Sequence, residues 1–475
     1  MTTIDLATLV LYMCGVVLLS YVIGRKEKSA EDYHFGGKAF GSLLLIATLA
    51  ATAMGASSVM GQAGAGYNNG VSTVWSMVIP WCIGWAFLIP MAKTIRRSGT
   101  TSFCNLMFKR FGRGCSKPIS AFQFVASMSG IAVQVTGMGS LIKIMFPQVS
   151  YELAVTLATA VTVLYTSFGG IKAVIWTDVI QVIMLTIGLC VVIPIMVFVG
   201  IKHAGMDWTA VKLTLGANKL SFMGTYTFAT LFPLIIRYMF AATCNTAYYQ
   251  RIAIAKDEKA AQRSQAGGIL SYLVLGSIII LTAMFISVIE PNNANPETVM
   301  TGYVIQHMPV VVRGLLIAAF FSAVMSSMDT FMLISAERFT MDIVEVEKRF
   351  PGNEKKQLMF SRLACAIIGV GGLLLSLVFK QVLAVMQYCT TITGASTFFP
   401  LVLGLYWKKA TGEGMLAGTL VGGVIAIVLG IVKIPGLDAT IIGNIGSLLS
   451  VILVSLATQK HTRLVGEHPG IWPAE

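Results

Sequence analysis

The stretch AAFFSAVMSSMDTFMLISAERFTMD, residues 318–342, begins as a hydrophobic span and ends in charged residues. Polar side chains lie inside its hydrophobic part, at a depth where lipid disfavours them: Ser322, Ser326, Ser327, Asp329 and Thr330. At about 100° per residue, Ser326, Ser327 and Thr330 share one helical face with Ala323, and Asp329 lies on its rim. Such hydroxyls often bond to their own helix and allow close packing. An intramembrane carboxylate, however, is costly and usually functional, so the cluster predicts hard oxygen ligands for a dehydrated alkali cation.

The composition is that of a polytopic membrane protein. Of the 475 residues, 56% are hydrophobic and only 12% are charged, and the mean hydropathy is +0.78. The eight cysteines form no CxxC motif and the five histidines show no ligand spacing, so neither a zinc site nor a disulfide framework is predicted. The first residues, MTTIDLATLV, lack a basic region, and we therefore expect no cleavable signal peptide.

A membrane-spanning helix needs roughly 20 predominantly apolar residues. Thirteen stretches meet this requirement: about 5–24, 41–66, 71–92, 118–146, 151–169, 172–200, 223–249, 266–289, 310–335, 360–379, 382–407, 413–432 and 438–458. We therefore predict an all-α polytopic membrane protein with about thirteen transmembrane helices.

The basic residues indicate how these spans are oriented. If the N-terminus lies outside, most of the 34 Lys and Arg residues fall in loops on the inner side, among them Arg25, Lys172 and Arg251. The net charge of +13 is then explained by inner loops, and nucleic acid is not predicted as a partner. We expect a multi-pass protein of the cell membrane with its N-terminus outside and its C-terminus in the cytoplasm.

Two of the predicted spans contain residues that interrupt helices. Residues 41–66 include Gly55, Gly61, Gly64 and Gly66, and residues 223–249 include Pro233 and the mid-span Arg237. Exposed backbone is tolerated in a membrane where it lines a cavity, although small residues also serve close helix packing. Because the two spans lie five spans apart, they favour an inverted repeat with a site at mid-membrane.

Five stretches of the chain resemble the sodium/solute symporter family. They are DYHFGGK (32–38), GQAGAGY (61–67), TSFGGIKAVIWTDVIQ (166–181), AVMSSMDTFML (323–333) followed by FTMDI (339–343), and GLYWKKATGEGMLAG (404–418). The resemblance implies a leucine-transporter-like fold with two inverted five-helix repeats. The chain would then divide into a first helix and inner loop (1–40), a first repeat (41–200), a second repeat (223–407) and two C-terminal helices with a short cytoplasmic tail (413–475).

The same resemblance implies a sodium site between the interrupted second span and the ninth span. Its ligands here would be the carbonyls of Ala51, Met54 and Ala323 and the hydroxyls of Ser326 and Ser327. This set agrees with the hydroxyl stripe described above. A neutral cage of oxygens suits a monovalent ion, since a divalent ion would call for carboxylates.

Some members of the family carry a second cation site, which would use Asp178, Ser326, Asp329 and Thr330 here. This sequence departs from the family by placing a carboxylate at Asp329, and two neighbouring carboxylates would either bind a cation or share a proton. The second cation is therefore Na⁺, H⁺ or absent. Alternatively, Asp178 caps a helix or pairs with Lys172, and Asp329 bonds a neighbouring Ser or Thr.

Arg237 is the strongest indication of the substrate. A mid-membrane guanidinium needs a partner and suits a carboxylate held at two points, although a permanent pair with Asp178 or Asp329 is the alternative. The family resemblance adds Tyr238, which matches a substrate-contacting position of sugar-transporting relatives. Other sugar-contacting positions are filled differently, by Ser58, Met77, Tyr272 and Thr390. The predicted substrate residues are Ser57, Ser58, Gln123, Arg237, Tyr238, Thr390 and Thr391, with Gln134 as a further candidate.

These observations predict a secondary active transporter that takes up a small organic anion or carboxylate-bearing solute together with Na⁺ by alternating access. An organic acid, an amino acid or an acidic sugar would fit. The alternatives are a neutral solute, such as a sugar or osmolyte, with Arg237 in a structural ion pair, and coupling to protons. An enzyme is not predicted, because no nucleophile–base pair, metal-ligand spacing or phosphate loop is present. We expect Na⁺ as the coupling ion, no organic cofactor, the lipid bilayer as surroundings, and a chain for which a monomer could suffice.

Overall fold

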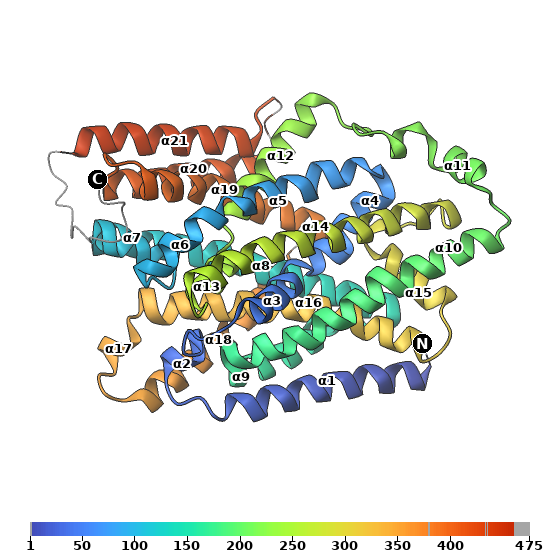
Figure 1. Ribbon diagram of the computed structural model, residues 1–475, viewed down its shortest axis with the longest axis horizontal. Helices are drawn as coiled ribbons and strands as arrows, with labels where there is room; N and C mark the ends of the chain where they lie inside the picture. The colour runs from blue at the N-terminus through green and yellow to red at the C-terminus, as the bar shows by residue number, and fades with distance from the viewer. Residues whose placement is uncertain (1, 379–380, 433, 435, 460–475) are drawn as a thin grey trace.

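The computed structural model describes residues 2–378, 381–432, 434 and 436–459. Within these residues every regular element is helical, and a single β-bridge joins Phe40 to Ala255. Figure 1 shows the long helices running side by side, with α1 along one flank and α20 and α21 along the opposite flank. The fold is thus the predicted all-α membrane bundle.

The helices, in chain order, are α1 Thr3–Gly24, α2 Ala30–Phe35, α3 Ser42–Ala53, α4 Ala63–Asn69, α5 Ile79–Ala86, α6 Leu88–Ser98, α7 Phe103–Phe111, α8 Arg113–Met145, α9 Tyr151–Ile187, α10 Ile193–His203, α11 Trp208–Leu220, α12 Phe228–Thr243, α13 Thr246–Ala253, α14 Glu258–Ile289, α15 Val299–His307, α16 Val312–Glu337, α17 Val346–Arg349, α18 Glu354–Ser376, α19 Val382–Tyr406, α20 Gly412–Val432 and α21 Ala439–Thr458. Short π-helical turns occupy Ser57–Gln62, Val74–Val78, Gly188–Val192 and Arg338–Ile343, and a 3-10 turn occupies Pro296–Thr298.

Ten helices of the described part are long and apolar enough to cross a membrane, or twelve if each of two bent helix pairs is one span. The predicted count of thirteen differs because residues Tyr151–His203 form one helical stretch of 53 residues. At about 1.5 Å per residue, such a stretch exceeds twice the thickness of a hydrocarbon core. The predicted boundary between two spans coincides with Gly170, whose backbone is non-helical at φ 61° and ψ −172°. The count of thirteen remains a prediction.

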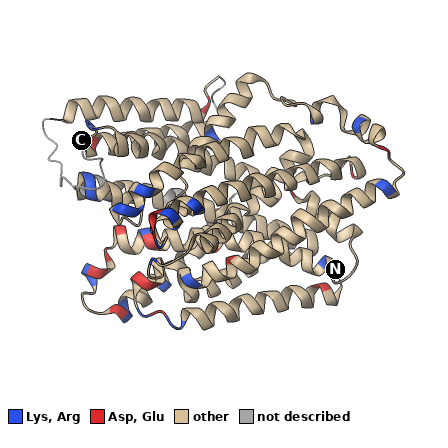
Figure 2. Cartoon of the chain, viewed as in Figure 1, with Lys and Arg blue, Asp and Glu red and all other residues tan. Residues whose placement is uncertain are grey.

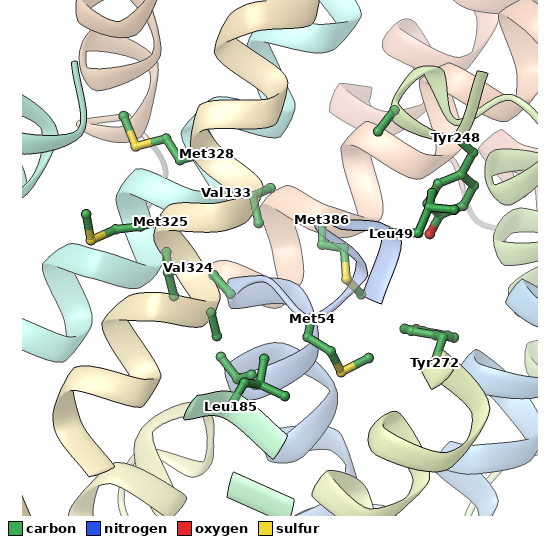
Figure 3. Packing of buried hydrophobic residues seen from close by; sticks show 14 of the residues in the cluster. Leu49, Met54, Val133, Leu185, Tyr248, Tyr272, Val324, Met325, Met328 and Met386 are labelled. Carbon is green, nitrogen blue, oxygen red and sulfur yellow. The ribbon is translucent and has the colours of Figure 1, made fainter. Parts of the chain in front are cut away.

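Helix α16 lies at the centre of the bundle. It packs against α9, α8, α1, α18 and α3, and nearly all of its residues from Leu316 to Glu337 are buried. In Figure 3, Met54 at the end of α3 lies between Val324 of α16 and Tyr272 of α14. The polar stretch that begins at residue 318 therefore lies in the core of the bundle. The break in α3 packs directly against it.

Charged residues are unevenly distributed over the bundle. Figure 2 shows Lys, Arg, Asp and Glu gathered mainly at the end where α6, α7 and α17 lie, away from the end where α1 begins. This is the distribution on which the predicted orientation depends. The orientation itself remains a prediction.

The second interrupted helix breaks at a position that differs from the predicted one. Helix α12 continues through Pro233 and ends at Thr243, and α13 begins after Asn245, whose side chain accepts the backbone N–H of Ala247 at 2.9 Å. The interruption is therefore set by an N-capping asparagine and not by the proline.

Helices α5 and α12 approach each other at Gly84. A Cβ atom there would overlap the carbonyl oxygen of Met239, and the hydroxyl of Thr243 donates to the Gly84 carbonyl at 2.8 Å. Close backbone approach through a glycine is typical of membrane helix interfaces. This contact holds the helix that carries Arg237 against its neighbour.

We expect Gly84→Ala to destabilise the protein, because the added methyl group must push α5 away from α12. Overpacking of this kind typically costs about 1–3 kcal/mol, which thermal unfolding in detergent would detect as a lower Tm. Gly15→Ala is the matched control, since no atom lies within 4 Å of a Cβ at exposed Gly15. Equal unfolding temperatures for the two variants would contradict the close contact.

Candidate functional site

The centre of the candidate site is the break after α3. Helix α3 is capped by Met54, whose φ of −96° and ψ of 42° lie outside the helical region. The next helical segment, Ser57–Asn69, is bent by 55° relative to α3. A Cβ at Gly55 would overlap the Ser327 hydroxyl and approach the side-chain oxygen of Gln134 to 2.7 Å. Only glycine allows α8 and α16 to pack this closely on the break.

Hydroxyls of α16 donate to carbonyls of the last turn of α3 and of α16 itself. Ser326 Oγ lies 3.1 Å from the Ala51 carbonyl and 2.9 Å from the Ala323 carbonyl, and Ser327 Oγ donates to the Thr52 carbonyl at 2.8 Å. All of these residues are buried. The structure thus brings together four of the five predicted sodium-site residues, and it places the fifth, Met54, at the helix end beside them. Oxygens of this neutral kind fit a monovalent cation.

Gln134 contacts the break in this structure. Its side-chain oxygen accepts the backbone N–H of Ala56 at 2.8 Å, one of the donors that a helix start leaves without an intrahelical partner. The side chain is buried. A role of Gln134 in substrate contact stays a prediction.

The predicted second cation site contains a guanidinium. Arg251 Nη2 lies 3.8 Å from Asp178 Oδ2 and donates to the hydroxyls of Thr48 at 3.1 Å and Thr330 at 2.8 Å. Thr48 in turn donates to Asp178. Arg251 and Asp178 are fully buried. The assignment of Arg251 to an inner loop was therefore wrong, because the chain after Asn245 turns this residue into the bundle.

The two aspartates have partners other than those considered from the sequence. Lys172 pairs with Asp32 and not with Asp178. Asp329 Oδ2 accepts the hydroxyl of Tyr165 at 2.9 Å instead of that of a neighbouring Ser or Thr. The other carboxylate oxygen of Asp329 is buried without a hydrogen-bond partner among the described residues. Three buried charged groups thus lie around one end of the break.

Arg237 lies in a different place, on the wall of a cavity of about 860 Å³. Its Nη2 is 3.7 Å from Asp438 Oδ2, and its Nε donates to Thr440 Oγ1 at 3.1 Å. The Thr440 hydroxyl is 3.4 Å from that of Thr391. Arg237 therefore does have an acidic neighbour, but this neighbour is Asp438 rather than Asp178 or Asp329.

The remaining predicted substrate residues are divided between two regions. Gln123 and Thr390 line a second, smaller cavity of about 90 Å³ that also contains Trp81 and Phe331. Tyr238 is fully buried beside Trp81, with ring centroids 6.3 Å apart. Ser58 donates to the Ala53 carbonyl at 2.9 Å, and Ser57 is half-buried.

Sequence reasoning did not identify Arg251, Asp438 or Thr440 as members of the site. Arg251 lies two residues beyond the predicted span 223–249, where a basic residue is typical of an inner loop. Asp438 stands at the start of α21 with the short polar side chain typical of an N-cap. No local signal indicates that it faces a residue 201 positions earlier in the chain.

We expect Arg251→Ala to destabilise the protein strongly, because it leaves Asp178 and Asp329 without their buried counter-charge. Breaking a buried pair costs about 3–5 kcal/mol, and adding Asp178→Asn should restore part of the loss. Thermal unfolding in detergent measures both effects. Arg97→Ala is the control, since Arg97 pairs with Glu258 at an exposed position where such pairs contribute little.

Unfolding of Arg251→Ala at the wild-type temperature without added salt would contradict this role of Arg251. Recovery of stability with NaCl but not with KCl would show that the two aspartates bind Na⁺ once the guanidinium is absent.

Residues 33–422 match the model of the Sodium:solute symporter family. The chain is 27% identical over 478 residues to the high-affinity proline transporter PutP of Bacillus subtilis, covering 95% of this chain and 97% of that protein. It is 26% identical to a sodium/pantothenate symporter of Haemophilus influenzae over 86% of both chains. It is 24% identical to the sodium/sialic acid symporter NanT of Aliivibrio fischeri over 95% and 92%.

Solved structures show the same fold. A substrate-bound, outward-open Na⁺-coupled sialic acid symporter superposes with a TM-score of 0.81 at 19% identity, covering 96% of this chain and 98% of that one. The nucleobase-cation-symport-1 family transporter Mhp1 in a closed conformation gives a TM-score of 0.63 at 15% identity, over 93% and 97%. The arrangement of broken and continuous helices is thus one that membrane symporters share.

Proposed function

Because this chain belongs to the sodium:solute symporter family, we propose that it takes up a small carboxylate-bearing solute, with Na⁺ bound at the break of α3. The protein is a transporter of the membrane and not an enzyme. Relatives named for sodium symport support Na⁺ as the coupling ion. The observation that carries the site is the contact of Ser326 with the carbonyls of Ala51 and Ala323.

The proposed Na⁺ site joins a broken helix to a continuous one. Ala51 and Met54 belong to the end of α3, whereas Ala323, Ser326 and Ser327 belong to α16. An ion bound between them would replace hydrogen bonds that the serines now donate to carbonyls. Na⁺ binding would therefore fix the position of α3 against α16 and stabilise one conformation over another.

We expect Ser326→Ala and Ser327→Ala each to weaken Na⁺ binding by about tenfold or more, because each removes one oxygen ligand from a desolvated site. Substrate binding titrated with NaCl at constant ionic strength measures the change. Ser335→Ala is the control on the same helix, since Ser335 bonds Phe331 and Ser127 away from the break. Wild-type Na⁺ affinity in both site variants would exclude the assignment.

The position of Arg251 favours coupling to a single Na⁺. The guanidinium lies between Asp178 and the hydroxyls of Thr48 and Thr330, where a second cation would need to bind. We therefore assign the positive charge of this region to Arg251 in place of a second Na⁺. The remaining alternative for a second coupling cation is a proton bound by Asp329.

The substrate side of the proposal depends on Arg237. The relatives named above transport proline, pantothenate and sialic acid, and each of these compounds carries a carboxylate. Arg237 lines the larger cavity and presents a guanidinium suited to two-point contact. The observation that favours a neutral solute instead is the ion pair with Asp438, which gives Arg237 a negative neighbour in this structure.

With the predicted orientation, the larger cavity opens to the outside, because it lies at the starts of α19 and α21, at the same end of the bundle as the start of α1. Uptake would proceed by binding of Na⁺ and solute from this side, followed by opening of the inner side. The chain would lie in the cell membrane with its C-terminus in the cytoplasm, and a monomer would be sufficient for this cycle.

We expect carboxylates to bind to purified wild-type protein in the presence of Na⁺ and to lose binding in Arg237→Ala. Matched neutral analogues should bind weakly to both proteins. Thermal-shift measurements with and without Na⁺ would detect the effect, and Arg237→Lys is a control that retains the charge without the bidentate geometry. Equal binding of the neutral analogues, together with lower stability alone in Arg237→Ala, would make Arg237 structural and leave the Na⁺ site untouched.

A further inference from the structure

The carboxylate of Asp438 is only partly used by the fold. One oxygen, Oδ1, accepts the backbone N–H groups of Thr440 at 2.9 Å and Ile441 at 3.1 Å, and so caps α21. The other oxygen lies 3.7 Å from Arg237 Nη2, which is longer than a hydrogen bond. The side chain is 35% exposed. Asp438 therefore retains one oxygen that faces both Arg237 and the cavity.

The guanidinium of Arg237 is also incompletely used. Its Nε donates to Thr440, and neither Nη group donates a hydrogen bond to any residue within the described ranges. A guanidinium carries five N–H donors, so most of them remain for a ligand. The side chain is 15% exposed, which keeps it partly desolvated and raises the strength of any contact with an anion.

The charges around the larger cavity do not favour a simple anion. Its charged lining residues are Arg237, Asp438 and Glu297. Both Glu297 oxygens accept backbone N–H groups at the start of α19, from Val382 at 3.0 Å and Leu383 at 2.8 Å. One cation thus lies among two carboxylates, and an anion that approached Arg237 would be repelled by Asp438.

A ligand that carries both a positive and a negative charge could pair with both Asp438 and Arg237. In an α-amino acid or imino acid, one carbon separates the ammonium from the carboxylate, and here the opposite charges of the wall lie 3.7 Å apart. The carboxylate would take the Nη donors of Arg237, and the ammonium would take the uncommitted oxygen of Asp438. The hydroxyl of Thr440 accepts the Arg237 Nε–H and still has a proton of its own to donate.

We propose that Arg237 and Asp438 together select a zwitterion, so that the transported solute is an amino acid or imino acid rather than an organic anion. This inference depends on the proposed function, because it places the carboxylate on Arg237. It adds Asp438 as the residue that recognises the ammonium group and rejects ligands that lack one.

The test compares binding of L-amino acids and L-proline with binding of their des-amino counterparts, such as propionate for L-alanine and cyclopentanecarboxylate for L-proline. Binding is measured in Na⁺ by thermal shift and by competition, for the wild type, Asp438→Asn and Arg237→Ala. Asparagine caps helices as well as aspartate does, so Asp438→Asn retains the cap while it removes the charge. Asp438→Ala, which loses both, separates a stability effect from a recognition effect.

We expect wild type to bind at least one amino or imino acid and to reject its des-amino counterpart. In Asp438→Asn this preference should fall by about tenfold or more, because a charge-assisted contact is lost, and the des-amino acid should gain affinity. The proposal is overturned if no amino or imino acid binds, if des-amino acids bind equally well to wild type, or if Asp438→Asn leaves the preference unchanged. If Arg237→Ala retains full binding, the proposed function fails as well, whereas loss of binding there with an unchanged Asp438→Asn overturns only the role of Asp438.

Discussion

A broken helix in a membrane exposes backbone groups that lipid cannot satisfy, and the core of this protein is arranged to meet that constraint. The carbonyls of Ala51 and Thr52 receive hydroxyls from Ser326 and Ser327, and the N–H of Ala56 receives the side chain of Gln134. Helices α8 and α16 must therefore approach the break closely, which only Gly55 permits. Because α16 supplies the hydroxyls, it is held at the centre of the bundle with almost no exposed surface.

The same constraint explains why polar groups concentrate on one side of α16. Ser326 and Ser327 face the break itself, whereas Thr330, one helical turn further on, faces Arg251. Asp329 points instead toward Tyr165 of α9. A single helical turn thus separates a neutral oxygen cluster from a charged one. Under the proposed function, this separation would let the neutral region bind an exchangeable ion while Arg251 occupies the other.

If one Na⁺ is coupled to uptake, as we propose, the charge of the substrate decides which driving forces are used. Inward movement of one net positive charge gains about 2.3 kcal/mol per 100 mV of membrane potential. A monoanion carried with one Na⁺ moves no net charge and uses only the Na⁺ gradient. A zwitterion carried with one Na⁺ moves one net charge and uses both driving forces, so the pairing of Arg237 with Asp438 and the burial of Arg251 beside Asp178 support the same mode of uptake.

The parts of this structure that depend on local patterns could be predicted from the sequence. Hydrophobic length predicted the helices, and the spacing of Ser326 and Ser327 predicted a shared helical face. The resemblance to the symporter family, and not the spacing, implied that this face meets the glycine-rich break. Residues paired across long sequence distances could not be predicted in this way. Arg251 was misplaced because charge counting assigns residues by their position along the chain, while the turn capped by Asn245 carries it inward. In the sequence, Asp438 shows only the pattern of a helix cap. Its contact with Arg237 becomes visible only when the fold brings α12 beside the start of α21.

The two cavities indicate how the broken helices would contribute to transport. Arg237 of α12 lines the larger cavity, and Ala241, one turn further along the same helix, lines the smaller one. Tyr238 lies buried between these two residues in the chain, packed on Trp81. If a solute binds at Arg237, its passage beyond Ala241 would require the smaller cavity to enlarge, because its volume is about 90 Å³ against about 860 Å³ for the larger one. The breaks at Cys244–Asn245 and at Met54–Gly55 are the positions where helices can change direction without breaking a continuous ladder of hydrogen bonds. Na⁺ bound at the Met54–Gly55 break would then favour one orientation of the two helical segments that meet there.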